Sequence, residues 1–203
     1  MHIDKEKHKT PKDNYYKKKC VKTQLVLGTS LRKDDYHIIR LKHKEFGKTK
    51  KWNMFTVSRE GTVYQHFNDV YYSDFLGNKD GDRQTISVIV ENMGYLLKTA
   101  EGEYLNWLNE LCDKENVLEK KWLSYKYWEK IQSKQMEALL ELCETMCEKH
   151  SIPKVCVDFQ NYHKDIHKFR GIVFRSNYLP DTNDLNPQFD PATLNEMLRN
   201  KFL

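Results

Sequence analysis

The chain has 203 residues, of which 39% are hydrophobic and 12% aromatic, so it can bury one core and is expected to form one domain. Its 34 basic and 29 acidic residues leave a formal net charge of +5, which suits an anionic neighbour but does not identify one. No apolar run has membrane-spanning length and the N-terminus lacks the apolar stretch of a signal peptide. We therefore expect no membrane partner and synthesis in the cytoplasm.

The cysteines are odd in number, five in all, and show no Cys-x-x-Cys spacing. Cys143 and Cys147 are four residues apart in a helical pattern, where they are typical of small apolar core residues. We expect free thiols and no structural zinc.

Residues 1–22 are expected to form a basic N-terminal arm, because no apolar periodicity begins before Val21. The lysines of this arm are Lys5, Lys7, Lys9, Lys12, Lys17, Lys18, Lys19 and Lys22. Two interpretations remain open: the arm docks on a polyanion or a partner protein, or it is a solvated tail, which is the commoner state of a lysine-rich terminus. Its apolar surface is too small for it to fold without a partner.

The main domain is expected to span residues 23–203. The elements predicted in its first half are a buried strand within 21–30, a short helix around 35–43, a hairpin of 54–57 and 62–67, and a strand at 86–90. Gly61 is suited to positive φ in the hairpin turn. The glycines and aspartates between 67 and 86 indicate a long surface loop.

Residues 92–130 are rich in tyrosine and tryptophan. Such rings stack on sugar faces, so the segment could be a glycan platform, although rings spaced among leucines more often cover a core. Residues 133–150 then form a predicted helix. Its apolar stripe consists of Met136, Leu139, Leu140, Cys143, Met146 and Cys147. Strands are predicted at 155–159 and 172–174, and a closing helix at 191–202.

A strand end followed by a polar loop, GIVFRSNYLPDTNDLNPQFDP at 171–191, is where α/β proteins usually place their chemistry. Together with LVLGTS at 25–30 and WNMFTVSREGTVYQHF at 52–67, it resembles the zinc-dependent N-acetylmuramoyl-L-alanine amidases. That superfamily includes phage amidase lysozymes and peptidoglycan recognition proteins. The resemblance covers most of residues 21–203 and implies a single α/β domain with a mixed central sheet flanked by helices. The 92–130 insertion looks like the branch found in large-genome phages.

The resemblance also assigns the metal positions. The first zinc ligand of the family is a histidine at the end of the first core strand, which corresponds to Gly28. The second ends the last strand, where this chain has Arg175, and the third precedes the Pro-x-Phe-Asp segment, where it has Asp184. Glycine has no side chain and arginine stays cationic, so neither binds zinc. We expect no bound cofactor and an Arg175 guanidinium paired with Asp184.

The remaining site positions follow in the same way. The tyrosine of the family's hairpin strand corresponds to Asn53, and the residue two positions before the third ligand is Thr182. Trp52 completes the candidate cleft with Gly28, Asn53, Arg175 and Asp184. A remodelled zinc site would need other histidines, namely His37, His43, His66, His163 and His167. Each of them is predicted to be a surface histidine.

The function implied is that of a phage-type, amidase-like protein that has lost its zinc site and its catalytic activity. It would bind peptidoglycan or serve as a structural virion component among other phage proteins. It would be made in the host cytoplasm, with the virion as a candidate destination. The alternative is an active zinc-dependent amidase, a cell-wall lysin with a remodelled site. A nucleic-acid-binding virion protein is disfavoured, because no nucleic-acid motif accompanies the lysines.

Overall fold

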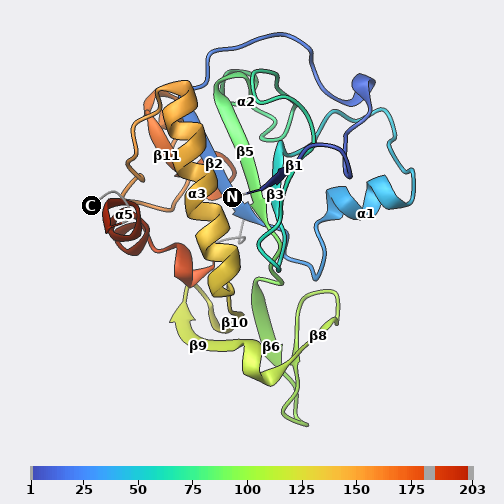
Figure 1. Ribbon diagram of the computed structural model, residues 1–203. Coiled ribbons are helices and arrows are strands. Elements are labelled where there is room, and N and C mark those ends of the chain that lie inside the picture. Colours follow the sequence, from blue (N-terminus) through green and yellow to red (C-terminus); the bar gives the residue numbers. More distant parts are fainter. Residues whose placement is uncertain (1, 181–185, 201–203) are drawn as a thin grey trace.

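A mixed six-stranded sheet forms the centre of the computed structural model, which describes residues 2–180 and 186–200 (Figure 1). Its order is β1-β4-β3-β5-β2-β11. The strands are β1 (Ile3–Asp4), β2 (Gln24–Thr29), β3 (Phe55–Val57), β4 (Val63–Gln65), β5 (Thr85–Val90) and β11 (Gly171–Phe174). β3, β5, β2 and β11 are parallel, whereas β4 is antiparallel to β3. The predicted fold class, a single domain with a mixed sheet and flanking helices, is confirmed.

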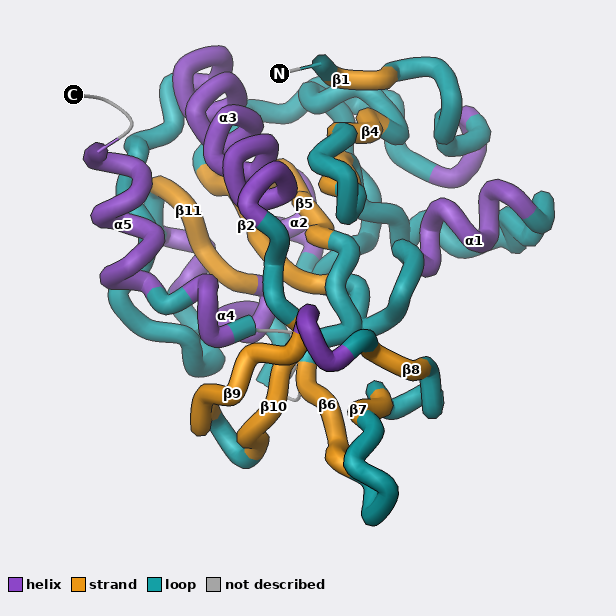
Figure 2. Tube along the Cα trace, turned by 60° about the horizontal axis from the view of Figure 1, so that its bottom comes forward, coloured by secondary structure: helices purple, strands orange, loops and turns teal. Residues whose placement is uncertain are grey.

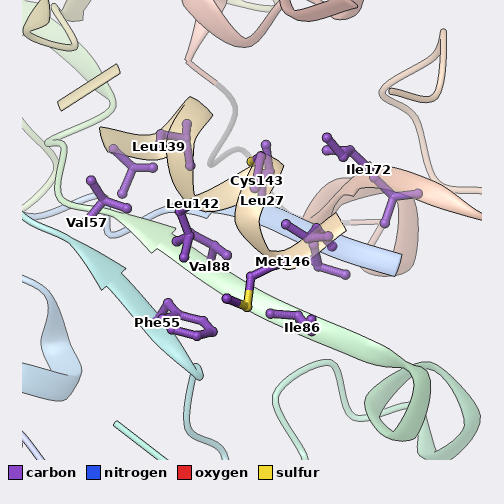
Figure 3. Close-up of a cluster of buried hydrophobic side chains, with 14 of the residues drawn as sticks. Leu27, Phe55, Val57, Ile86, Val88, Leu139, Leu142, Cys143, Met146 and Ile172 are labelled. Atoms are coloured by element: carbon purple, nitrogen blue, oxygen red, sulfur yellow. The ribbon is translucent and has the colours of Figure 1, made fainter. Parts of the chain in front are cut away.

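Helix α3 (Ser133–His150) covers one face of this sheet, with α5 (Pro191–Asn200) beside it (Figures 1 and 2). The shorter helices are α1 (Tyr36–Lys42), α2 (Lys79–Gln84) and α4 (Arg175–Tyr178). Figure 3 shows the packing under α3, in which Leu139, Leu142, Cys143 and Met146 meet side chains of the sheet. Those sheet side chains are Leu27, Phe55, Val57, Ile86, Val88 and Ile172.

Successive side chains of a strand point to opposite faces of the sheet, and this alternation determines which residues lie on the face away from α3. Leu27 pairs with Val88, which pairs with Phe55, and these three side chains point towards α3. The next row, Gly28, Ile89 and Thr56, must therefore face away from α3. This second face is where the candidate site lies.

Residues 95–129 form a second, antiparallel sheet with the order β8-β7-β6-β10-β9. Its strands are β6 (Tyr95–Lys98), β7 (Tyr104–Leu105), β8 (Leu111–Cys112), β9 (Val117–Trp122) and β10 (Tyr125–Glu129). It extends from one end of the main sheet, within the segment expected to be an insertion (Figures 1 and 2). Met93, Leu96 and Cys112 form a small core of its own. A partly buried ion pair between Arg59 and Glu129 links it to the β3–β4 turn.

The N-terminal segment differs from the expected arm, because residues 2–22 lie against their own domain. β1 adds to β4 as a parallel strand, and the main-chain N–H of Thr10 donates to the His66 carbonyl at 2.9 Å. Tyr15 stacks on Phe67 with ring centroids 4.8 Å apart. Lys22 is buried and donates to two main-chain carbonyls, and burial lowers its pKa to about 8. Backbone pairing and tyrosine stacking thus replace the apolar periodicity that the segment lacks.

Most of the other predicted elements are confirmed, including the 133–150 helix and the hairpin with Gly61 at φ +80°. The predicted strand at 155–159 is wrong, since only Cys156 forms a bridge, to Ile172. The expected surface loop between 67 and 86 contains α2 and a buried Asp82. All five cysteines are free thiols. Among the described residues, no helix has the length and apolarity needed to span a membrane.

Candidate functional site

A cavity of about 310 Å³ lies at the carboxyl end of β2, between α1, the segment before β3, and the start of α4. Ile89 contributes to it from the sheet face turned away from α3. The other lining residues are Thr29, Ser30, Asp35, Tyr36, His37, Arg40, Thr49, Lys51, Asn53, Phe75 and Arg175.

The structure brings two of the predicted site residues, Asn53 and Arg175, into this one cavity. Gly28 adjoins it through its chain neighbour Thr29 and its sheet partner Ile89. Trp52 is fully buried behind the wall, where it stacks on His37 with ring centroids 3.9 Å apart. Thr182 and Asp184 lie outside the described residues, so the pairing of Arg175 with Asp184 stays a prediction.

Asn53 is the centre of a buried polar network in the cavity wall. Its Nδ2 donates to Asp35 Oδ2 at 3.1 Å, to Thr56 Oγ1 at 2.9 Å and to the Phe55 carbonyl at 2.8 Å. Asp35 also accepts a hydrogen bond from the Thr56 hydroxyl and, through Oδ1, one from the main-chain N–H of His37 at 3.0 Å. Both carboxylate oxygens of Asp35 are therefore occupied. The network fixes the connection between β2 and α1 against β3.

Two histidines expected at the surface, His37 and His66, are in fact buried in this wall. His66 Nδ1 donates to the His8 carbonyl at 2.7 Å, and its Nε2 lies 2.7 Å from Thr56 Oγ1. Burial lowers the pKa of His66 below its usual value. Its hairpin position gave no hint of this, because the carbonyl that it bonds belongs to the N-terminal segment. Of the other candidates, His43 and His163 are exposed and His167 is half-buried.

His37 holds an unusual position among the cavity residues. Two groups of Asn53 contact its Nδ1. The main-chain N–H donates to Nδ1 at 3.0 Å, and in this tautomer the neutral ring carries its proton on Nε2. In the other tautomer Nδ1–H would donate to Asn53 Oδ1. Nε2 is buried and, among the described residues, has no hydrogen-bond partner. Burial, followed by the nearby His66 and Arg40, holds the pKa of His37 well below its usual range.

The cations of the cavity are Arg40, Lys51 and Arg175. Arg40 lies over the Trp52 ring at 4.7 Å and donates to the carbonyls of Glu45 and Phe46 at 3.0 and 2.7 Å. Arg175 lies over the Phe75 ring at 5.1 Å. Within residues 2–180 and 186–200, neither Arg40 nor Lys51 forms an ion pair.

Zinc does not fit the side chains described here. Catalytic zinc needs three protein ligands, and no three His, Cys, Asp or Glu side chains are grouped in this way in the described part of the chain. Among the described residues, Asp35 and His37 are the only ones of those types that line the cavity, and both oxygens of Asp35 are already bonded. The three cations would further oppose a divalent metal.

Glu91 was not singled out from the sequence, although it directly follows the apolar run of β5. Its Oε1 accepts the main-chain N–H of Asp35 at 2.9 Å, and only 7% of the residue is exposed. Burial raises its pKa to about 7. Glu91 therefore supports the β2–α1 connection from behind the cavity.

No protein-family model and no curated protein matches the chain. Solved structures do resemble it. AmiA, a Staphylococcus aureus hydrolase solved with its ligand, superposes with a TM-score of 0.58 at 10% identity, covering 100% of this chain and 84% of that one. The catalytic domain of XlyA gives 0.56 at 13% identity, with 98% and 99% covered. The N-acetylmuramoyl-L-alanine amidase LysC from Clostridium intestinale gives 0.51 at 12% identity, with 96% and 98% covered. The chain therefore has the fold of N-acetylmuramoyl-L-alanine amidases.

Proposed function

We propose that the protein binds peptidoglycan through the cavity without hydrolysing it, as an amidase-like component of a phage particle or of the lysis machinery. The observation that carries this proposal is the presence of Arg175 in the cavity wall, at the position where the resemblance puts a zinc-binding histidine. Gly28, the equivalent of the first ligand, lies in the adjoining strand and offers no donor atom.

The chemistry of the wall supports binding over cleavage. Amide hydrolysis in this fold class depends on a metal-bound water and a polarised carbonyl, and the described residues offer no metal site. What they do offer is a polar wall, three cations and a half-exposed Tyr36 ring at the rim. Such a surface can hydrogen-bond and stack on a glycopeptide.

The test combines three measurements on the purified full chain: zinc content, release of amino groups from peptidoglycan, and co-sedimentation with insoluble sacculi. We expect no stoichiometric zinc, no hydrolysis and saturable co-sedimentation. Arg175→Ala should weaken sedimentation about tenfold or more, as expected for a charged hydrogen bond of ~1.5–3 kcal/mol. Arg170→Ala is the matched control, since it removes the same charge from an exposed residue at the other end of β11.

Zinc near one equivalent, or hydrolysis that a chelator abolishes, would overturn this proposal in favour of an active amidase with a remodelled site. Absence of binding to sacculi would leave a role among other virion proteins. That role would be tested by whether purified particles contain the chain.

A further inference from the structure

Cations outnumber acids in the described lining of the cavity. Arg40 and Lys51 line it from two separate segments, and Asp35 is the only acidic residue among the described lining residues. Asp35 is 4% exposed, and its oxygens accept hydrogen bonds from His37, Asn53 and Thr56. Its carboxylate is therefore used in hydrogen bonds within the cavity wall. It is not available to a ligand or as a partner of Arg40 and Lys51.

Arg40 is held in place before any ligand arrives. Its guanidinium stacks over Trp52, and the carbonyls that accept from Nε and Nη2 are neutral. These contacts restrict the side chain without cancelling its charge. A positioned arginine loses little conformational entropy when it binds a planar or tetrahedral anion.

His37 provides a second, independent sign of a ligand. A buried polar atom is nearly always hydrogen-bonded, yet Nε2 of this cavity-lining ring has no partner among the described residues. In the tautomer in which Nδ1 accepts the Asn53 main-chain N–H, the ring has its N–H at this atom. A ligand acceptor atom would satisfy it.

The segment that joins two of the lining residues, Arg40 and Lys51, is strongly basic. Between residues 40 and 51 the only acidic residue is Glu45. The basic residues of this segment are Arg40, Lys42, Lys44, Lys48, Lys50 and Lys51. At the rim, the Arg32 guanidinium lies over the rings of both Tyr36 and Trp107, at 4.8 and 5.0 Å. Such a field attracts an anionic polymer and concentrates it at the mouth of the cavity.

We infer that the cavity is an anion-binding site, in which a carboxylate or phosphate group of a cell-wall polymer meets Arg40, Lys51 and the Nε2–H of His37. The identity of the polymer rests on the proposed function, whereas the anion site does not. The group could come from the peptide stem, as a carboxylate, or from a wall teichoic acid, as a phosphodiester.

The experiment uses the full chain and two simple probes, inorganic phosphate and acetate, titrated by NMR and calorimetry. We expect saturable binding, with a shift of the His37 Nε2 resonance that saturates at the same concentrations. Lys51→Gln should weaken binding about tenfold. Lys134→Gln, which removes the same charge from an exposed residue of α3 on the other face of the main sheet, should change it less than twofold. Both lysines are exposed, so neither change should disturb folding.

Two results would overturn the anion site: no saturable binding of either probe, or equal weakening by the two lysine variants. The sources are separated with sacculi that retain or lack teichoic acid, and with muropeptides whose stem carboxylates are free or amidated. If the protein binds sacculi, but phosphate neither competes with that binding nor shifts the His37 resonance, the anion site is refuted and the proposed function stands. If phosphate binds in the cavity but sacculi do not, the proposed function fails and the anion site stands.

Discussion

Asn53 shows how one residue can organise a site without itself being a reactive group. Its amide joins β3 to Asp35, and its main-chain N–H fixes the His37 ring. The resemblance placed Asn53 in the cleft, and the structure puts it in the cavity wall with Arg175. The burial of His37 and His66 could not be predicted from the sequence, because it depends on partners far along the chain, such as the His8 carbonyl.

The metal positions can be tested by restoring ligands. Gly28→His combined with Arg175→His should create a three-ligand set with Asp184, so the double variant should gain about one zinc equivalent. Gly28 lies in a regular strand, where a histidine fits the backbone. Zinc content after dialysis measures this, and each single variant is the control, since two ligands hold zinc poorly. A double variant that stays free of zinc would show that the three positions do not converge.

Glu91 predicts a specific pH dependence of stability. Its pKa is about 7 in the folded chain against an ordinary value of 4.5, so the folded state binds the extra proton between these limits. The stability that this proton contributes is complete below pH 4.5 and is lost as the pH rises through 7. Glu91→Gln keeps an acceptor for Asp35 N–H but does not ionise. Relative to the unmodified chain, its free energy of unfolding should therefore increase between pH 5 and 8.5, by on the order of 3 kcal/mol at most.

Urea unfolding of both chains at each pH measures this difference. The histidines with lowered pKa act in the opposite direction, since His8, at about 4, lowers stability as the pH falls below 6.5. That effect is common to the two chains and cancels. A constant difference across the pH range would contradict the assigned ionisation of Glu91.

At the scale of elements, agreement between sequence and structure follows the strength of the local pattern. Helix α3 begins and ends where predicted, because its apolar stripe continues over about three turns, from Met136 to Cys147. The segment 155–159 alternates like a strand but leaves the sheet after Cys156. Asn177 donates to the carbonyls of Phe159 and Asn161, at 3.1 and 3.0 Å, and draws that stretch towards α4. The apolar periodicity of the sequence cannot show that a distant side chain will bond these main-chain carbonyls.

The packing of α3 gives a prediction about stability. Leu139 is fully buried under the helix, so Leu139→Ala should lower the free energy of unfolding by about 2–5 kcal/mol. Glu137→Ala, on the exposed side of the same helix, should change it by less than about 0.5 kcal/mol. Chemical denaturation of the unmodified chain and the two variants, analysed with one common dependence of unfolding free energy on denaturant concentration, would measure both changes. Equal effects would mean that α3 does not pack on the sheet as described.

At the scale of the whole molecule, the N-terminal segment and the second sheet are attached to the core in different ways. The second sheet has its own small cluster of apolar side chains, whereas the N-terminal segment has none and depends on the main sheet for order. The lysine content of the segment led to the expectation of a free arm. Composition cannot show that an open strand edge is available to pair with.

Removal of residues 1–20 tests this attachment. Several main-chain hydrogen bonds and the Tyr15–Phe67 stack would be lost, so we expect the free energy of unfolding to fall by about 2 kcal/mol or more. Differential scanning calorimetry measures the change, and limited proteolysis of the full chain should spare this region. Unchanged stability together with rapid cleavage before residue 20 would restore the free-arm interpretation.

The placement of β1 also bears on solubility. An uncovered edge strand is a template on which another chain can add a strand and start aggregation. In the main sheet β1 covers β4 at one edge, and the short bridge at Cys156 lies against β11 at the other. Proteolytic loss of the N-terminal residues would expose β4, so the shortened chain should be prone to self-association during storage or expression, even where it remains folded.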